Sequence, residues 1–417
     1  LNDTASFTND FAPTLLAFYM PNLSSAEGIT MNQDFLNRLN IYSGELQQIF
    51  EQPEHTTIAG GRVQYGNFAV SNQQDTPSDD ASLFNSPAAR QNTGGIFRRF
   101  SLYGYHQWQI IAPLQIIAGL DYDYLTFPEL FSTAPVSGTE RTEQQFSPKA
   151  GLIFTPWDGT TARFAYSRSL AGASIDQSYQ IEPSQLAGFI QNYRSIIPES
   201  ILGPTPGARF STYDLSLEQK FHTGTYLTIS GEILDSKDDL VNGIFAYNFL
   251  SMPYAEPSTL DENLNYQEET FQFTANQLLA RDWSLGLKYR LSHAVLNENY
   301  PGVSDSIILA DPAFQPQTKA TLNQLDLTAI YNHPSGFFAE GEALWFDQNN
   351  DGYNPAEPGD NFWQFNIFAG YRSPRRNVEV AIGLLNIANQ GYNLNPLNIY
   401  NELPLARTLA CRLQINF

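Results

Sequence analysis

The stretch from Asp347 to Glu357 carries oxygen-bearing side chains with the spacing of a calcium-binding loop. Asp347 stands at position 1, Asn349 at position 3, Asp351 at position 5 and Tyr353 at position 7, with a glycine at position 6. Alternating oxygen ligands suit a hard cation, and the glycine permits the sharp turn of such a loop. The acid expected at position 12 is instead Glu357, at position 11. Calcium is one interpretation, and an acidic polar loop without an ion is the other.

A second set of residues could act on ions or solutes if it lines a pore. These charged side chains alternate with apolar ones, which places them on one face of the strands that carry them. They are Asp121, Asp123, Arg163, Asp214, Glu218, Lys220, Glu232, Lys288, Arg290, Asp326, Glu340, Glu342, Glu379 and Arg412. Rings of charged side chains inside a pore select ions or solutes. A network of salt bridges that fills the lumen without selecting anything is an equal alternative.

Catalysis and nucleic-acid binding have little support in the composition. The five histidines are His55, His106, His222, His293 and His333. None accompanies a serine in a recognisable nucleophile arrangement, so we expect no enzyme. The formal net charge is −21, from 22 Lys and Arg against 43 Asp and Glu, and a chain this acidic repels phosphates. The single cysteine, Cys411, excludes an internal disulfide and a cysteine-based metal cluster.

The last residues indicate which elements position these side chains. From Thr408 to Phe417, apolar and polar residues alternate, with Leu409, Cys411 and Leu413 on one face. A period of two is that of a half-buried β-strand. The chain stops on Phe417, which is typical of the closing strand of bacterial outer-membrane β-barrels. In lipid a sheet with an open edge is not viable, so every earlier segment should supply a partner strand.

The connections between the predicted strands alternate strictly between tight turns and long polar loops. The predicted hairpin strands are residues 40–50, 55–70, 99–111, 114–125, 146–155, 160–170, 210–221, 225–235, 270–280, 283–295, 322–332, 337–346, 361–371 and 378–385. With the closing strand and an uncertain initial strand at 11–20, the total is about 16. Outer-membrane barrels have short periplasmic turns and long extracellular loops. We therefore predict one domain over residues 1–417, an all-β, antiparallel, up-and-down transmembrane β-barrel, in which residues 1–38 are the least certain part.

The bulk composition agrees with this fold class. The mean hydropathy is −0.31, and the sequence has no run of about 18 apolar residues, which excludes a transmembrane helix. A barrel passes this test because half of each strand faces a polar lumen. Aromatic residues recur near strand ends, as interfacial girdles require. They are Tyr124, Phe127, Trp157, Tyr226, Trp283, Trp345, Trp363 and Tyr371.

The longest connection, residues 171–209, could control passage through such a barrel. It contains Tyr179, Phe189, Tyr193 and several prolines, and a short helix is expected over 183–189. Such a loop could fold into the mouth as a constriction or lid. An extracellular cap that packs on neighbouring loops is equally consistent with its composition.

Three stretches resemble the barrel of TonB-dependent outer-membrane receptors. They are Phe146 to Pro156 continuing through Ala165 to Ser169, Arg99 to Tyr124, and Gly383 to Asn389 continuing through Tyr400 to Pro404. Those receptors carry an N-terminal plug and a barrel of about 22 strands. This chain has no room for a plug, so the resemblance is to plug-less, receptor-like barrels, including those preceded by tetratricopeptide repeats.

The resemblance implies a transport protein of the bacterial outer membrane, in contact with membrane lipid and lipopolysaccharide. Passage of a solute or polymer through a polar lumen is the first hypothesis. A structural or surface-binding protein, with a closed lumen and acidic loops that contact a partner or matrix, is the second. Export needs a signal peptide, and the chain does not begin with one. We therefore expect a processed or trimmed chain that a periplasmic or repeat domain precedes.

Overall fold

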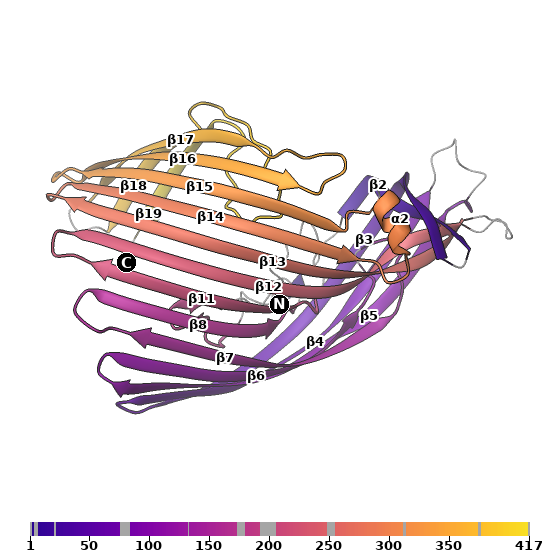
Figure 1. Cartoon of the computed structure of the whole chain (residues 1–417), viewed down its shortest axis with the longest axis horizontal. Helices are drawn as coiled ribbons and strands as arrows, with labels where there is room; N and C mark the ends of the chain where they lie inside the picture. Colours follow the sequence, from indigo (N-terminus) through magenta and orange to yellow (C-terminus); the bar gives the residue numbers. More distant parts are fainter. Residues whose placement is uncertain are drawn as a thin grey trace.

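A computed structural model describes residues 2–3, 7–20, 22–75, 84–131, 133–172, 180–191, 206–247, 255–311, 314–373 and 377–415. Nearly all of the regular structure is one sheet of 17 strands (Figure 1). Its wall is made of β3 (Asn22–Glu51), β4 (His55–Asp75), β5 (Ala89–Ile111), β6 (Leu114–Pro128), β7 (Glu140–Phe154), β8 (Thr160–Leu170), β11 (Arg209–Lys220), β12 (Thr225–Tyr247), β13 (Ala255–Leu279), β14 (Trp283–Asn299), β15 (Gln317–Asn332), β16 (Phe337–Asp351), β17 (Asn361–Arg372), β18 (Val378–Leu385) and β19 (Thr408–Ile415). Each of these strands pairs antiparallel with the next, and β8 pairs with β11. The up-and-down order predicted from the sequence is confirmed.

The tight turns all lie at one end of the sheet, on the left in Figure 1. They connect β3 to β4, β5 to β6, β7 to β8, β11 to β12, β13 to β14, β15 to β16 and β17 to β18. Gly224 and Gly336 have φ angles of 76° and 99° in two of these turns, a conformation that only glycine adopts without strain. The alternation of tight turns and long loops is therefore a property of the fold as well as of the sequence.

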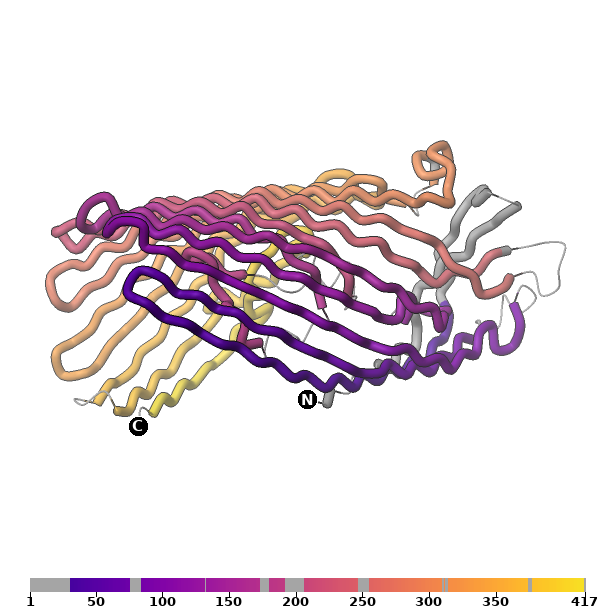
Figure 2. Tube along the Cα trace, turned by 90° about the horizontal axis from the view of Figure 1, so that it is seen from below, coloured from indigo at the N-terminus to yellow at the C-terminus, as the bar shows by residue number. Residues whose placement is uncertain are grey.

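The two faces of the wall differ as the period of two requires. In β11, Leu215 and Leu217 are 62% and 50% exposed, whereas Asp214 and Ser216, which alternate with them, are buried. The exposed apolar face lies on the outside of the curved sheet. Figure 2 shows the curvature, which brings β3 and β4 (indigo) and the last strands (yellow) to the same side of the molecule. No helix in the described part of the chain is long and apolar enough to cross a membrane.

Several strands are longer than the apolar alternation predicts. β12 has 23 residues and β13 has 25, and they remain paired from Thr225 and Gln277 to Tyr247 and Ala255. A bilayer needs only about 9–11 residues of a tilted strand. The outer halves of these strands therefore extend beyond the membrane. Their exposed side chains are polar there, so the lipid-facing pattern ends before the strand does.

The predicted initial strand exists, but it has another place in the fold. β2 (Phe7–Met20) pairs with the half of β3 that lies far from the tight turns, and its residues 15–18 run parallel to Ile244–Tyr247 of β12. The two-residue strand β1 (Asn2–Asp3) also pairs with β3. The first residues thus lie along the extracellular extension of the wall. The prediction that residues 11–20 span the membrane is wrong, because an apolar run does not specify its partner.

Three other expectations concern single elements or residues. The expected helix at 183–189 is wrong, and the helix that the described chain does contain, α2 (Asp305–Ala310), lies in another loop. Phe127 is 3% exposed and packs inside the wall, so it is no girdle residue. Trp157, Trp283 and Tyr371 are exposed, as the girdle requires. The terminal Phe417 lies outside the described residues.

Candidate functional site

The residues predicted to line a pore lie on the inner face of the wall. This follows from the pairing, because each shares its face with buried rather than with exposed apolar neighbours. Several form ion pairs, each between adjacent strands. The pairs are Asp123 with Arg99, Asp121 with Lys149, Arg163 with Glu218, Arg290 with Glu268, and Glu379 with Arg372 and Arg412. These pairs follow the wall instead of crossing the lumen, and the role of the charges in selectivity stays a prediction.

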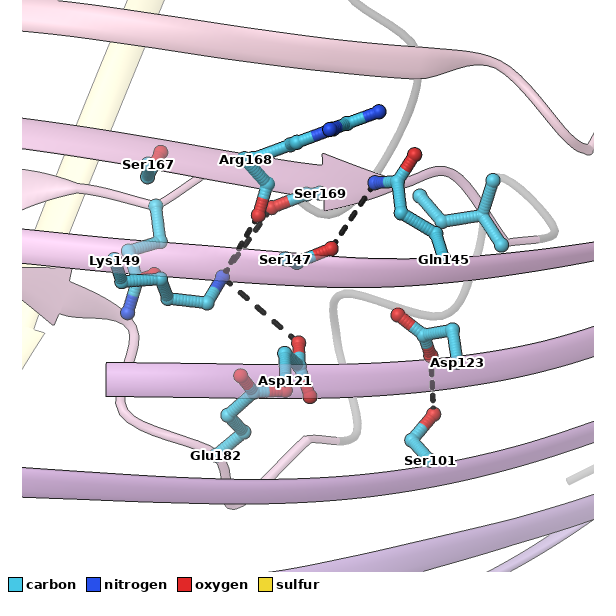
Figure 3. Close-up of polar contacts among 12 residues, drawn as sticks. Ser101, Asp121, Asp123, Gln145, Ser147, Lys149, Ser167, Arg168, Ser169 and Glu182 are labelled. Atoms are coloured by element: carbon cyan, nitrogen blue, oxygen red, sulfur yellow. Dashed lines mark hydrogen bonds and ion pairs between the residues drawn. The ribbon is translucent and has the colours of Figure 1, made fainter.

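A buried polar cluster of this face lies on β5, β6, β7 and β8 (Figure 3). The Arg99 Nη2 atom lies 2.9 Å from Asp123 Oδ1, and the two side chains are 2% and 1% exposed. Ser101 Oγ donates to the same oxygen at 2.5 Å, and Arg99 also donates to the carbonyl of Leu170 at 3.1 Å. A buried charge is tolerated when it is paired and hydrogen-bonded in this way.

Lys149 of β7 extends the cluster toward β8. Its Nζ atom lies 3.9 Å from Asp121 Oδ2 and donates to the Arg168 carbonyl at 3.3 Å and to Ser169 Oγ at 3.4 Å. Figure 3 shows the Glu182 carboxylate beside Asp121. Sequence reasoning missed Arg99 and Lys149 as lumen residues. Arg99 lies two residues from Ser101 on β5, and Lys149 lies two residues from Ser147 on β7. This alternation along each strand places them on the inner face and is the signal that could have found them.

Glu182 belongs to a segment, residues 180–191, that enters the lumen. It forms a small hairpin of β9 (Gln185–Leu186) and β10 (Phe189–Ile190) where the sequence suggested a helix. Ala187 and Gly188 have φ angles of 51° and 92°, which suit the two central residues of a tight hairpin turn. The sequence analysis overlooked Ala187 and Gly188 as the residues of a tight turn. Tyr179 and Tyr193, on either side, lie outside the described residues.

The wall holds this hairpin through hydrogen bonds to Glu45 of β3. The backbone amides of Ile181 and Glu182 donate to the two carboxylate oxygens of Glu45 at 3.1 and 3.0 Å. Gln47 Nε2 donates to the Ile181 carbonyl at 2.6 Å, and Tyr105 Oη donates to Glu182 at 2.6 Å. These contacts come from side chains, so they can break without opening the sheet.

Apolar packing completes the seat of the hairpin. Leu186 and Ala187 are 1% and 3% exposed and pack on the wall residues Ile117 and Ala165. A Cβ atom on Gly151 would lie 3.0 Å from the Ala187 Cβ atom, so this glycine makes room for the turn. The wall residues that hold the hairpin lie within a few residues of the tight turns. The described part of the long loop therefore lies against the inner face of the wall near the tight turns, and its role as a constriction stays a prediction.

A second segment, residues 386–407 between β18 and β19, lies against the inner face of the later strands. Leu397 is fully buried beside inward residues that include Leu264. Gln348 holds Asn395 twice: its Nε2 donates to the carbonyl at 2.9 Å, and its Oε1 accepts from the amide at 2.6 Å. Many such amide contacts hold residues 386–407 against the inner face, and we call this segment the lining of the lumen.

The tyrosines of this lining donate to its own backbone. Tyr392 Oη donates to the Leu403 carbonyl at 3.0 Å, and Tyr400 Oη donates to the Leu394 carbonyl at 3.1 Å. Burial, together with the nearby Tyr392 and Glu402, raises the pKa of Tyr400 above its ordinary value. Its hydroxyl therefore keeps its proton and remains a donor over the whole physiological range.

A cavity of about 210 Å³ lies beneath the lining. Lys288, Arg290, Asp326 and Glu342 line it, together with residues of the lining such as Asn401. Four of the residues predicted from the sequence thus meet at one cavity, two cations facing two anions. Such a cavity can bind a small polar solute by hydrogen bonds and charge, and it cannot take a polymer without movement of the lining.

The predicted calcium loop is mostly strand. Asp347, Asn349 and Asp351 belong to β16 and pair with β15, and Glu357 accepts a hydrogen bond from Asn395 at 2.8 Å. Among the described residues, no group of three or more His, Cys, Asp or Glu side chains converges as metal ligands would. The expected wrapping of residues 347–358 around one point is thus not the observed geometry, and calcium binding stays a prediction.

These features define a class of protein. A curved antiparallel sheet with an apolar outer face, a charged inner face, tight turns at one end and long loops at the other is a transmembrane β-barrel of the outer membrane. A family model described as TonB dependent receptor-like, beta-barrel, matches residues 2–212. The chain belongs to this family, and its location is the outer membrane.

Three solved structures with the same fold have low sequence identity to this chain. The copper transporter OprC is 14% identical with a TM-score of 0.54, and 95% of this chain aligns with 59% of that chain. The ferric yersiniabactin uptake receptor FyuA from Yersinia pestis is 10% identical with a TM-score of 0.54, over 94% and 57% of the two chains. The ferric-catecholate import receptor Fiu from K12 E. coli is 12% identical with a TM-score of 0.51, over 95% and 57%. The chain thus spans less than two thirds of these proteins, and no curated protein matches its sequence.

Proposed function

We propose that the protein transports a small polar solute across the outer membrane through a lumen that the hairpin of residues 180–191 constricts. One observation carries the proposal: the hairpin is seated inside the lumen by reversible side-chain contacts, the two amide bonds to Glu45 above all. A segment that only capped the loops would need no such seat on the wall. Movement of the hairpin would open the path without breaking a strand pair.

The charges of the inner face suggest which solutes pass. The chain carries 43 acidic against 22 basic residues, and Asp326 and Glu342 face the cavity beneath the lining. An acidic pore concentrates cations and excludes anions. The proposed substrate is therefore a small cationic or neutral solute. Solved structures of the same fold include a copper transporter and a ferric yersiniabactin uptake receptor, and transport rather than catalysis is the proposed role.

The test is conductance in planar bilayers. The purified chain is compared with a variant in which residues 184–191 are replaced by a short Gly-Ser linker. We expect small or rare openings for the unmodified chain and large, steady conductance for the variant, because the hairpin blocks the periplasmic end. A linker exchange of equal length in residues 302–309, which include most of α2, is the matched control and should leave conductance unchanged.

Silence of both proteins after verified insertion would overturn transport through this lumen. The result would favour the alternative, a structural or surface-binding protein with acidic loops. Steady conductance of the unmodified chain, equal to that of the variant, would keep transport but remove the hairpin as its constriction.

A further inference from the structure

The outer face of the wall carries a largely apolar groove of about 550 Å³ across β8, β11, β12, β13 and β14. Leu215, Gly231 and Phe271 are directly paired across three strands and lie in one outward row. Because Gly231 has no side chain, this row is hollow between two large apolar neighbours. Phe164 continues the row on β8. Glu269 and His293 line the groove at its end on β13 and β14. The apolar part around Gly231 has the shape and polarity that a hydrocarbon chain requires.

A polar pocket of about 400 Å³ adjoins the groove on the side away from the tight turns. The paired Tyr166 and Tyr213, whose ring centroids are 4.8 Å apart, mark the boundary between the two. Its charged lining residues are Arg141, Arg168, Arg209, Lys237, Asp235, Asp238 and Asp239. With Glu143, which pairs with Arg141 and Arg209, the four cations meet four acids, a larger share of cations than in the chain as a whole, whose net charge is −21.

The cations of this pocket are incompletely compensated. Arg209 and Lys237 lie directly opposite each other on β11 and β12, and like charges in that position repel. Arg209 pairs with Glu143, but Lys237 and Arg168 form no ion pair within the described part of the chain. Figure 3 shows the Arg168 side chain pointing away from the lumen cluster. Lys237 and Arg168 are thus two cations on the outer face that could bind an anion.

The order of the two features along the wall matches a membrane lipid. On β8, β11 and β12, apolar residues cover the outer face up to the row of the tyrosine pair, and the charged Arg168 and Asp235 lie one row beyond it, where the headgroups of the outer leaflet lie. Arginine binds phosphate with two parallel hydrogen bonds, which suits a headgroup at this level. A free anion would use the pocket and leave the groove empty.

We propose that this face is a specific site for a phosphate-bearing lipid of the outer leaflet. Its phosphate is bound by Arg168 and Lys237, and an acyl chain lies in the groove over Gly231. The site is independent of the lumen and does not depend on the transport function. It would fix the orientation of the barrel relative to the leaflet and anchor the extended strands.

Native mass spectrometry of the full chain released from detergent tests the site. The probes are bisphosphoryl lipid A, monophosphoryl lipid A and a diacylglycerol of matched chain length. We expect retained adducts in the order of phosphate number and none with diacylglycerol. Arg168→Gln with Lys237→Gln should lower retention roughly tenfold, about the effect of a lost charge-assisted contact. Arg98→Gln, which removes an outward cation above Tyr65 on other strands, is the matched control.

Filling the groove separates a lipid from a free anion. Gly231→Leu is sterically permitted, because the nearest atom to a new Cβ is the Thr270 carbonyl oxygen at 3.7 Å. It should reduce lipid A retention while inorganic phosphate fails to displace the lipid from the unmodified chain. Displacement by inorganic phosphate, or equal retention in the double variant and Arg98→Gln, would overturn the proposal. Heat-modifiable migration on gels verifies that each variant is folded.

Discussion

At the scale of single residues, the buried ion pair of Arg99 and Asp123 is the most sensitive contact of the wall. Both side chains are almost fully buried, and the arginine is the only cation in contact with Asp123 among the described residues. Removing one partner of a buried pair leaves an uncompensated charge, which costs about 3–5 kcal/mol. We expect Arg99→Met to lower the free energy of unfolding in urea by that amount.

The double variant Arg99→Met with Asp123→Asn is the control for this prediction. It removes both charges, so much of the lost stability should return. If the single and double variants unfold at the same urea concentration, the charge left on Asp123 is not what destabilises the protein.

Glu45 is the residue on which the hairpin depends. A neutral amide in its place offers one oxygen instead of two, and hydrogen bonds to a charged group contribute about 1 kcal/mol more than neutral ones. Glu45→Gln should therefore speed hydrogen exchange of the Ile181 and Glu182 amides by roughly five- to tenfold. The exposed Glu54→Gln, in the tight turn after β3, should leave these amides unchanged. Equal exchange in both variants would show that other contacts hold the hairpin.

At the scale of elements, the fit between β7 and the hairpin can be tested by volume. Gly151→Val places atoms against Ala187 and Ile117, so the hairpin must shift while the strand pairs remain. We expect faster swelling of proteoliposomes in small sugars than with the unmodified chain. Gly341→Val is the control, because no atom lies within 4 Å of its Cβ position. Swelling that is equally fast for both variants would mean that the hairpin does not limit passage.

One physical requirement explains why some strands are longer than the apolar alternation in their sequence. Within the bilayer each outward residue must be apolar, and this requirement produces the period of two in the sequence. Beyond the bilayer the outer face meets water, so the exposed side chains of β12 and β13 are polar there, while residues such as Phe245 and Leu260 stay buried on the other face. Strand pairing there is held by backbone hydrogen bonds, which any sequence can form.

At the scale of the whole molecule, the excess of acidic residues should set the selectivity of the pore. In a salt gradient, the variant with the hairpin replaced should give a reversal potential of cation-selective sign. Asp326→Asn with Glu342→Gln should reduce that potential, because both carboxylates face the cavity. Glu269→Gln, on the outer face, should not change it. A reversal potential that ignores the cavity variants would place the selective charges elsewhere.

Much of the fold was determined by the sequence alone. The seven tight turns, the spanning strands from β3 to β19 and their two faces follow from local signals: turn residues and the period of two. Even the inward placement of Asp121 and Asp123 required only counting along one strand. Such signals are local because the lipid acts on each strand separately, and it demands the same alternation of all of them.

Only the tertiary structure decided what occupies the lumen. The seat of the hairpin joins Glu45 to Glu182, residues 137 positions apart, and the lining joins Asn395 to Gln348. The place of β2 beside β12 likewise joins segments far apart in the chain. Polar side chains that face a water-filled lumen can pair with many different partners, so no sequence pattern indicates which partner each one has. Their partners are set by which loop the curvature of the sheet brings within reach, and that is a property of the folded chain.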